Sequence, residues 1–202
     1  MPLRTDLAII SQWIIPGSRV LDLGCGDGAL LAHLRDNFSV KGYGFEIDNR
    51  HIAQCMGAGL NVVQGNLDEG LSDFDSNSFD YVIMTQTLQA VRSPNRLVVE
   101  MLRVGREGIV TFPNFGHWSS RIQIALRGKM PISKALPGQW YDTPNIHLCT
   151  VSDFERLCKE SDIRVLQRAV VDVAHHESPL MRLYPNLFGE IAIYRIRKST
   201  TR

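Results

Sequence analysis

The 202-residue sequence contains no apolar run that approaches the roughly 20 residues needed to span a membrane. Its first residues include the charged Arg4 and Asp6 and no apolar core of the signal-peptide type. The four cysteines form no C-x-x-C pair and no evident disulfide framework. We therefore expect a reduced, cytoplasmic protein that does not act at a membrane.

Signatures of metal and nucleic-acid binding are also missing. None of the six histidines stands in an H-x-x-x-H or H-E-x-x-H arrangement, so a metal site is expected only if distant parts of the chain supply its ligands. The formal net charge of +1 gives no electrostatic reason to expect a nucleic-acid partner. The length suits one domain with its own core.

The stretch Val20–Gly28 carries the clearest motif. A short apolar run breaks into the glycine-rich segment Gly24–Gly28, and leucines then restart at helical spacing. Strand, glycine turn and helix form the first unit of a dinucleotide-type α/β fold. Glycines allow the sharp turn and, because they have no Cβ, let a ligand lie against the backbone.

Two cofactor patterns fit these glycines. Gly24, Gly26 and Ala29 match the G-x-G-x-x-G/A spacing of nicotinamide and flavin sites. Gly24, Gly26 and Gly28 match the G-x-G-x-G spacing of S-adenosylmethionine sites equally well. The glycines alone leave the choice open, and a structural turn without any ligand fits them too.

Two carboxylates near the glycines help to separate the cofactors. Asp22 precedes the first glycine by two residues, and Asp27 lies inside the loop. Both would repel a pyrophosphate, which binds at a helix N-terminus free of anions. Both would attract the sulfonium and ammonium groups of S-adenosylmethionine. The charges therefore favour S-adenosylmethionine, or its product S-adenosylhomocysteine, over NAD.

The second predicted strand ends at an acidic side chain. Glu46 follows the first glycine by 22 residues, the distance at which dinucleotide-type folds place a ribose-binding carboxylate. A carboxylate accepts two hydrogen bonds at once and so suits a cis-diol. Asp48 or Asn49 is expected to cap the helix that follows.

The third and fourth predicted strands also end at polar residues. The uncharged amide oxygen of Asn66 can accept a hydrogen bond from an adenine amino group, and the backbone N–H of Leu67 can meet a ring nitrogen. Gln86 lies at the edge where open α/β sheets bind ligands and is a candidate cofactor or substrate contact. Thr85 and Thr87 are candidates for a helix cap.

These motifs predict one cofactor site. No compact acid–base pair lies beside the expected methyl position, so no catalytic residue is assigned, and no metal ligand is predicted. The predicted cofactor-binding residues are Asp22, Gly24, Cys25, Gly26, Glu46, Ile47, Asn66, Leu67 and Gln86.

Strands and helices alternate along the chain. Five βα units within about 110 residues predict a parallel sheet. The predicted fold class is α/β: a doubly wound, mostly parallel, seven-stranded Rossmann-like sheet of the class I methyltransferase type, with the last strand antiparallel. Strands are predicted at residues 20–23, 41–45, 61–64, 79–84, 109–112, 163–173 and 190–196, and the last of them is expected near a sheet edge.

Helices are predicted at residues 3–14, 29–37 and 49–56, and two more are predicted to begin at Pro94 and at a capping box over Ser152–Glu155. Thr5 or Asp6 is expected to cap the first helix, and Ser93 the helix that begins at Pro94. Residues 174–188 are expected to form a loop in which His175 and His176 are exposed.

Residues 113–150 form the least regular stretch. A helix is predicted to begin at His117 and to end at Gly128, and the rest is expected to be a long ordered loop, too aromatic for disorder. The stretch could be a substrate lid with His117, Tyr141 or His147 as acid or base, a docking surface, or a small second core. The sequence thus predicts a single methyltransferase-like domain that carries a lid or docking insertion.

Five longer motifs carry a resemblance to a known family. They are Gly65–Leu71, Gln86–Gln89, Met101–Arg106, Phe112–Trp118 and Gln139–Thr150. Together with the glycine loop they resemble the methionine-biosynthesis family MetW, and the resemblance covers about Arg4 to Ile196. The position of Asn66 is usually Asp in this family. Because Asn keeps an acceptor, adenine binding is expected to survive.

The resemblance implies a cytoplasmic protein of methionine biosynthesis. In that family the chain acts with a homoserine O-acyltransferase, an α/β-hydrolase, and supports its activity. S-adenosylmethionine is an end product of the route, which leads to the hypothesis of feedback through the cofactor pocket. The expected function is therefore a cofactor-binding partner or activator of that acyltransferase.

A second function stays open, because fold alone does not settle function. The fold suggests a methyltransferase that acts on an unidentified small molecule, and methyl transfer can proceed by positioning alone. The segment Thr85–Leu88 stands where enzymes that methylate amino groups of bases or glutamine have Asn-Pro-Pro-Tyr, which argues against those substrates. A nicotinamide enzyme is a third alternative.

Overall fold

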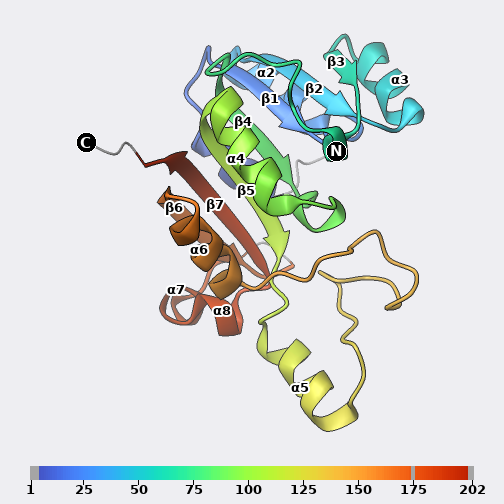
Figure 1. Cartoon of the computed structure of the whole chain (residues 1–202), viewed down its shortest axis with the longest axis vertical. Helices are drawn as coiled ribbons and strands as arrows, with labels where there is room; N and C mark the ends of the chain where they lie inside the picture. The colour runs from blue at the N-terminus through green and yellow to red at the C-terminus, as the bar shows by residue number, and fades with distance from the viewer. Residues whose placement is uncertain (1–4, 174–175, 200–202) are drawn as a thin grey trace.

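The computed structural model describes residues 5–173 and 176–199, and its strands form one seven-stranded sheet (Figure 1). The strands are β1 (Arg19–Leu23), β2 (Lys41–Glu46), β3 (Asn61–Gln64), β4 (Phe79–Thr85), β5 (Gly105–Pro113), β6 (Ile163–Val171) and β7 (Ile191–Lys198). Their order is β3-β2-β1-β4-β5-β7-β6. Neighbours from β3 to β5 pair in parallel, whereas β7 runs antiparallel to β5 and β6. The predicted sheet with an antiparallel last strand is confirmed.

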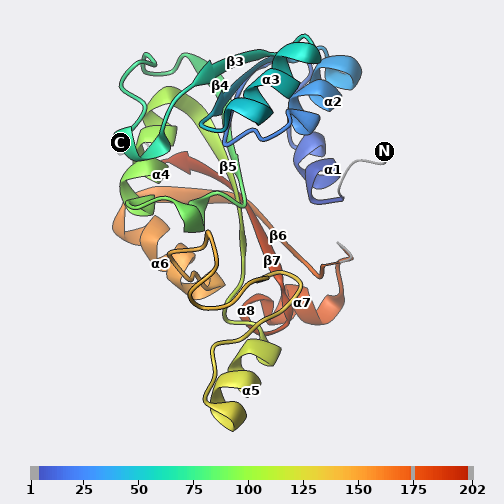
Figure 2. The same cartoon turned by 90° about the vertical axis from the view of Figure 1, so that its right-hand side faces the viewer.

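Helices cover both faces of this sheet. They are α1 (Thr5–Gln12), α2 (Ala29–Phe38), α3 (Asn49–Gly57), α4 (Pro94–Val104), α5 (Trp118–Arg127), α6 (Val151–Glu160), α7 (Pro179–Leu183) and α8 (Pro185–Phe188), with the 3₁₀ turns η1 (Leu67–Glu69) and η2 (Leu88–Ala90). Figure 2 shows α1, α2 and α3 on one side of the sheet and α4 and α6 on the other. Within the described residues, no helix is long and apolar enough to cross a bilayer.

Alternate residues of the strands supply two apolar cores. Ile191 and Ile193 of β7 pack with α1 and α2, whereas Ala192, Tyr194 and Ile196 pack with α4 and α6. Strands covered on both faces need apolar side chains at successive positions, which explains the continuous apolar runs in the sequence. The strand β7 lies one position in from the edge, beside the edge strand β6.

Local capping signals predict one helix start correctly and misplace another. Asp48 caps α3, because its Oδ1 accepts the N–H of Arg50 at 2.7 Å. The capping box of α6 is Thr150 with Asp153, so the predicted box at Ser152–Glu155 is wrong by two residues. The Thr150 hydroxyl accepts the N–H of Asp153 at 3.1 Å, and the Asp153 carboxylate accepts the N–H of Thr150 at 3.2 Å. The earlier start buries the first helical residue in the core.

The predicted loop over 174–188 is wrong in part, because it contains α7 and α8. Each of these short helices has a proline in its first turn, where a missing N–H costs nothing. The side chain of His176 is 80% exposed, as expected. Ala174 and His175 lie outside the described residues, and β6 ends at Val171.

Two other helix starts were expected to have side-chain caps. The helix α4 begins at Pro94 as predicted, but Ser93 makes no side-chain cap hydrogen bond. The helix α1 ends at Gln12, earlier than predicted. The proposed caps of α1, the side chains of Thr5 and Asp6, lie outside the described part of the chain.

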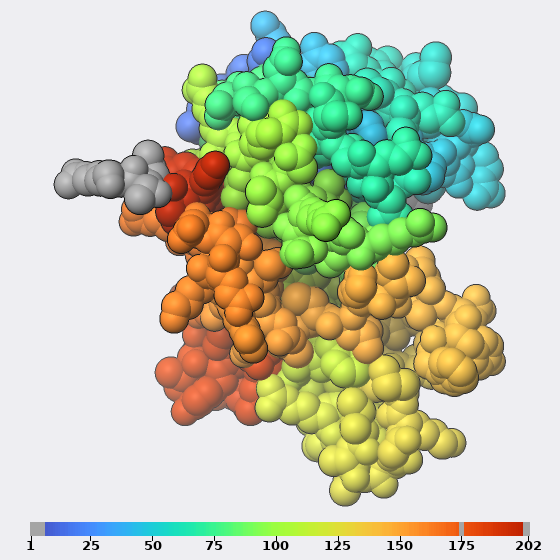
Figure 3. All heavy atoms as spheres, viewed as in Figure 1, coloured from blue at the N-terminus to red at the C-terminus, as the bar shows by residue number. Residues whose placement is uncertain are grey.

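Residues 114–150, between β5 and α6, form an arm that extends beyond the sheet (Figures 1 and 2). The helix α5 has His117 at its N-cap and Gly128 at its C-cap, so the predicted termination at Gly128 is confirmed. Most of the remaining arm is irregular backbone. In Figure 3 the arm, coloured yellow to light orange, stands out from the body of the molecule.

Asn114 fixes the root of the arm and is 2% exposed. Its Nδ2 donates to the carbonyl oxygens of Asn186 and Gly189 at 3.1 and 2.7 Å. Its Oδ1 accepts the N–H groups of Gly116 and Val151 at 3.0 and 3.2 Å. One buried side chain therefore joins the arm to the start of α6 and to the segment around α8.

We predict that Asn114→Ala lowers the free energy of unfolding by about 2–4 kcal/mol, because it leaves several buried backbone groups without a partner. Asn95→Ala, at an exposed position of α4, is the matched control and should stay within about 0.5 kcal/mol of the unmodified protein. Chemical denaturation followed by circular dichroism measures both. Equal stability of the two variants would contradict the anchoring role of Asn114.

Candidate functional site

The carboxyl ends of β1, β2 and β3 and the turn η2 surround a pocket of about 460 Å³. This volume lies within the range of roughly 300–1,000 Å³ typical of small-molecule sites. Ligands of open α/β sheets bind at this edge. The pocket is lined by Gly24, Gly26, Phe45, Glu46, Ile47, Asp48, His51, Gly65, Asn66, Leu67, Asp68, Thr87, Ala90 and Val91.

Six of the nine predicted cofactor-binding residues meet in this lining: Gly24, Gly26, Glu46, Ile47, Asn66 and Leu67. They come from three different strand ends, which parallel pairing brings to one edge of the sheet. Asp22, Cys25 and Gln86 do not line the pocket.

The glycine loop needs its glycines for two reasons. Gly24, Gly26 and Gly28 have φ values of +70°, +55° and +79°, which residues with a Cβ rarely adopt. A Cβ on Gly24 would also lie 2.8 Å from the hydroxyl oxygen of Thr87. The loop thus packs closely against the turn before η2, and that contact brings Thr87 into the pocket wall.

Glu46 ties the glycine loop to the end of β2. Its side chain is buried, and its Oε2 accepts the N–H of Gly26 at 2.9 Å. Its Oε1 accepts the N–H groups of Ile47 and Asp48 at 2.8 and 3.0 Å. A carboxylate offers about four acceptor positions, so roughly one is left. A ribose diol at Glu46 would therefore replace or share the hydrogen bond from Gly26.

Asp22 and Cys25 are buried and do not line the pocket. Asp22 is 1% exposed on β1. The thiol of Cys25 lies 3.9 Å from that of Cys55 on α3, and the Cys55 thiol donates to the carbonyl of Gly26 at 3.3 Å. Burial, and then the nearby charge of Asp22, raise the pKa of Cys25 well above its usual value. Burial also raises the pKa of Cys55, so both thiols stay protonated at neutral pH, and they pack together at the loop.

Asn66 lines the pocket and also begins a 3₁₀ turn. Its Oδ1 accepts the N–H of Asp68 at 3.0 Å and so caps η1. Asp68 in turn accepts the N–H of Arg92 at 2.7 Å. The pocket wall is thus connected by hydrogen bonds to the segment that follows η2.

Gln86 has a backbone role in this structure. Its φ is +50°, and its N–H donates to the carbonyl and hydroxyl oxygens of Thr111, each at 3.0 Å. Its own carbonyl accepts from the amide of Gln89 at 2.7 Å. Thr87 occupies the N-cap position of η2 without a side-chain cap, because its hydroxyl donates to the carbonyl of Thr85.

The structure does not bring the candidate acids and bases of the arm together. His117 caps α5, with its Nδ1 2.8 Å from the hydroxyl of Ser119, and burial lowers the pKa of its imidazole. Tyr141 is 71% exposed. The Nε2 of His147 donates to the carbonyl of Arg92 at 3.2 Å. None of the three lines the pocket.

Sequence reasoning missed several lining residues. Phe45 and Gly65 stand beside predicted residues at strand ends, so the rule that found Glu46 and Asn66 could have found them too. A Cβ on Gly65 would overlap the tip of the Phe45 ring, so the ring packs directly against the backbone at Gly65. Thr87, Ala90 and Val91 reach the pocket only because η2 folds back on the glycine loop, and no sequence signal predicts that contact.

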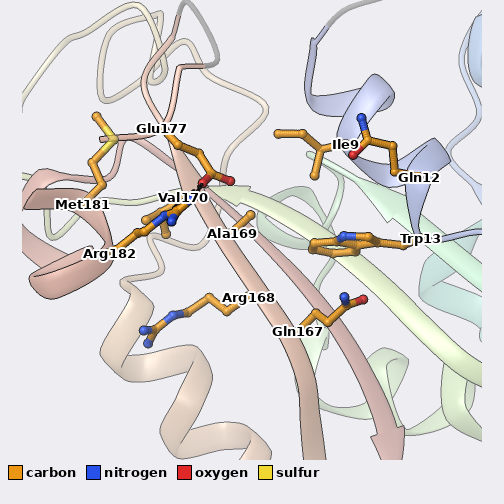
Figure 4. A pocket seen from close by; sticks show the side chains of 10 residues that line it. All are labelled: Ile9, Gln12, Trp13, Gln167, Arg168, Ala169, Val170, Glu177, Met181 and Arg182. Carbon is orange, nitrogen blue, oxygen red and sulfur yellow. Dashed lines mark hydrogen bonds and ion pairs between the residues drawn. The ribbon is translucent and has the colours of Figure 1, made fainter. Parts of the chain in front are cut away.

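A second hollow of about 500 Å³ lies between α1 and the segment formed by β6 and α7 (Figure 4). Figure 4 shows Trp13 on one side and the Glu177–Arg182 ion pair, whose atoms are 2.8 Å apart, on the other. It shares no lining residue with the glycine-loop pocket. Over residues 5–173 and 176–199, no group of three or more His, Cys, Asp or Glu side chains is arranged to hold a metal.

The family model described as "Methionine biosynthesis protein MetW" matches residues 4–196. This chain belongs to the MetW family. The bifunctional methionine biosynthesis protein MetXA/MetW of Rhodopirellula baltica is 35% identical over 203 residues, a match that covers 95% of this chain and 32% of that protein. The chain therefore spans about a third of that relative's length.

Two solved structures share the fold. A SAM-dependent methyltransferase from Mesorhizobium loti superposes with a TM-score of 0.70 and 16% identity over 95% of this chain and 96% of that one. A SAM-dependent methyltransferase from Thermotoga maritima superposes with a TM-score of 0.65 and 17% identity, and the match covers 97% of this chain and 89% of that one. At these identities the comparison shows the class I methyltransferase fold.

We predict that Glu46→Gln destabilises the ligand-free protein by about 1–3 kcal/mol, because the glutamine NH₂ would face backbone N–H groups that now have an acceptor. Glu69→Gln, at an exposed position of η1, is the control and should change stability by less than about 0.5 kcal/mol. Denaturant unfolding of both variants measures the difference. If Glu46→Gln is as stable as the control, Glu46 does not hold the loop.

Proposed function

We propose that this protein binds S-adenosylmethionine or S-adenosylhomocysteine in the glycine-loop pocket and acts as the partner or activator of a homoserine O-acyltransferase in methionine biosynthesis. The observation that carries the proposal is the relative whose name joins MetXA and MetW in one bifunctional chain. Two activities kept on one polypeptide are held at high effective concentration, as in a stable complex. The proposal includes a cytoplasmic location, where the partner enzyme would act.

The pocket supports the cofactor part of the proposal. Glu46 would accept from the ribose hydroxyls, giving up or sharing its bond to Gly26. Asn66 and the N–H of Leu67 would face the base, and Ile47 would pack against it. The backbone of the loop from Gly24 would cradle the amino-acid end, with Asp22 and Cys25 supporting the loop and Gln86 fixing the turn before η2. The sulfonium and ammonium charges would benefit from the nearby carboxylates.

The arm supports the partner part of the proposal. The exposed large apolar side chains concentrate there, at ten positions between Trp118 and Leu148. Trp140 and Tyr141 are 74% and 71% exposed and contact each other edge to face at 5.5 Å between ring centroids. Exposed aromatic pairs of this kind are typical interface anchors. We propose that residues 113–150 are a docking insertion on a single methyltransferase-like domain.

A methyltransferase that acts on an unidentified small molecule is the second candidate. The similarity to SAM-dependent methyltransferases favours it. It needs a methyl acceptor beside the cofactor, and His117, Tyr141 and His147 do not line the pocket. Incubation of the protein with a labelled methyl donor and cell extract distinguishes the methyltransferase from the partner role. Label that disappears in Glu46→Ala supports this candidate, and absence of label despite bound cofactor supports the partner role.

We predict that Trp140→Ala weakens binding to the homoserine O-acyltransferase of the same organism by about tenfold or more, because it removes an aromatic anchor. Leu183→Ala is the control, since Leu183 is 67% exposed on α7, outside the arm. The affinity of this variant for the acyltransferase should stay within about twofold of that of the unmodified protein. Both residues are exposed, so both variants should fold. Calorimetric titration measures the affinities. Equal affinities of Trp140→Ala and the control would contradict an interface formed by the arm.

A further inference from the structure

The helix α5 carries an apolar stripe on a side that is open to solvent. Trp118, Ile122 and Leu126 recur at intervals of four residues, so they lie along one side of the helix. All three are exposed, Leu126 by 80%. Within α5, all of which the structure describes, Ser120 alone is buried. It stands two positions before Ile122 and therefore on nearly the opposite side of the helix.

This arrangement reverses the usual orientation of a surface helix. A helix that packs on its own domain turns its apolar side toward the core, whereas in α5 a serine is on the inner side. Figures 1 and 2 show the helix at the far end of the arm, away from the sheet. Isolated helices as short as α5, with its 10 residues, are marginally stable in water, and helices in proteins are stabilised mainly by burial of an apolar side. The stripe is therefore suited to burial against another molecule.

The arm, residues 114–150, also differs from the rest of the chain in charge. It contains four cations, Arg121, Arg127, Lys129 and Lys134, and one carboxylate, Asp142, which is a formal net charge of +3. The rest of the chain has 18 Lys and Arg and 20 Asp and Glu, a formal net charge of −2. Among the described residues, none of the four cations forms an ion pair, whereas nine arginines outside the arm do. The charges of the arm are thus available to a partner.

The stripe and the free cations together describe the surface that would cover α5. Amphipathic helices bind in apolar grooves through side chains spaced as in this stripe. Carboxylates on the rim of such a groove would complement the cations of the arm and speed the encounter. An anionic membrane fits less well, because membrane affinity grows with buried apolar area and the stripe has only three side chains. The rest of a second copy of this chain offers a net charge of only −2.

We propose that α5 is a docking helix whose apolar stripe inserts into an apolar groove of the acyltransferase, and that carboxylates on the rim of this groove pair with Arg121, Arg127 and Lys129. The inference rests on the proposed function, because it takes the acyltransferase as the partner. It deepens that function by naming the helix that docks and the chemistry of the surface that receives it. The contact would extend along the arm the interface proposed at Trp140 and Tyr141.

The test of the stripe compares two isoleucines of α5 by calorimetric titration of the full chain with the acyltransferase of the same organism. Ile122→Gln changes the stripe, and Ile124→Gln changes a residue outside it. Their side chains are 46% and 43% exposed, and glutamine favours a helix at least as well as isoleucine, so both variants should fold. Ile122→Gln should weaken binding by about tenfold or more, and Ile124→Gln by less than about twofold.

The test of the charges repeats the titration at low and at high salt concentration. Binding of the unmodified protein should weaken as salt is added, because salt screens exposed charges. Lys129→Glu should weaken binding by about tenfold at low salt and by much less at high salt. Lys159→Glu, at an exposed position of α6, is the control and should bind within about twofold of the unmodified protein under both conditions.

The outcomes separate this inference from the proposed function. If the unmodified protein binds the acyltransferase and Ile122→Gln binds it as tightly as Ile124→Gln, the docking helix is overturned and the proposed function stands. The same holds if Ile122→Gln keeps its affinity for the acyltransferase but dissociates a dimer of this chain in sedimentation, or loses binding to vesicles of anionic phospholipid. Failure of the unmodified protein to bind the acyltransferase overturns both.

Discussion

Parallel pairing of β3, β2, β1, β4 and β5 is the constraint on which the rest of the structure depends. It places the ends of these strands at one edge, so residues far apart in sequence share one pocket. Glu46 then joins two of these ends, because its carboxylate holds the glycine loop through Gly26 and its own strand end through Ile47 and Asp48.

Much of this arrangement could be predicted from the sequence because its signals are local. The glycine loop, the acidic residue after β2 and the alternation of strands and helices each depend on neighbouring residues. The misplaced capping box of α6 shows the limit of such signals, since Thr150 with Asp153 and Ser152 with Glu155 have the same spacing. Burial of Val151 in the core decides between them, and that is a tertiary contact. The wall contributed by Thr87 and the thiol of Cys55 at the loop depend likewise on contacts between distant segments.

The pocket and the arm are two surfaces of the molecule with different chemistry. The pocket combines carboxylates and one amide with the apolar side chains of Phe45, Ile47, Leu67, Ala90 and Val91, which together suit a small ligand with a charged part and an apolar part. The arm exposes aromatic and aliphatic side chains, which suit a protein. Asn114 anchors the arm at its root, and the N–H groups of Ile146 and His147 donate to the carbonyl of Gln89 in η2, whose neighbours Ala90 and Val91 line the pocket. A ligand and a partner protein would therefore act on neighbouring parts of the same structure.

The central claim is that this chain supports a homoserine O-acyltransferase. The most direct measurement is the rate of homoserine acylation by the acyltransferase of the same organism, alone and with an equimolar amount of this protein. A large increase in the acylation rate is expected when the protein is added. An unchanged rate, together with no detectable complex between the two proteins, would contradict the account and favour a methyltransferase with an unidentified acceptor.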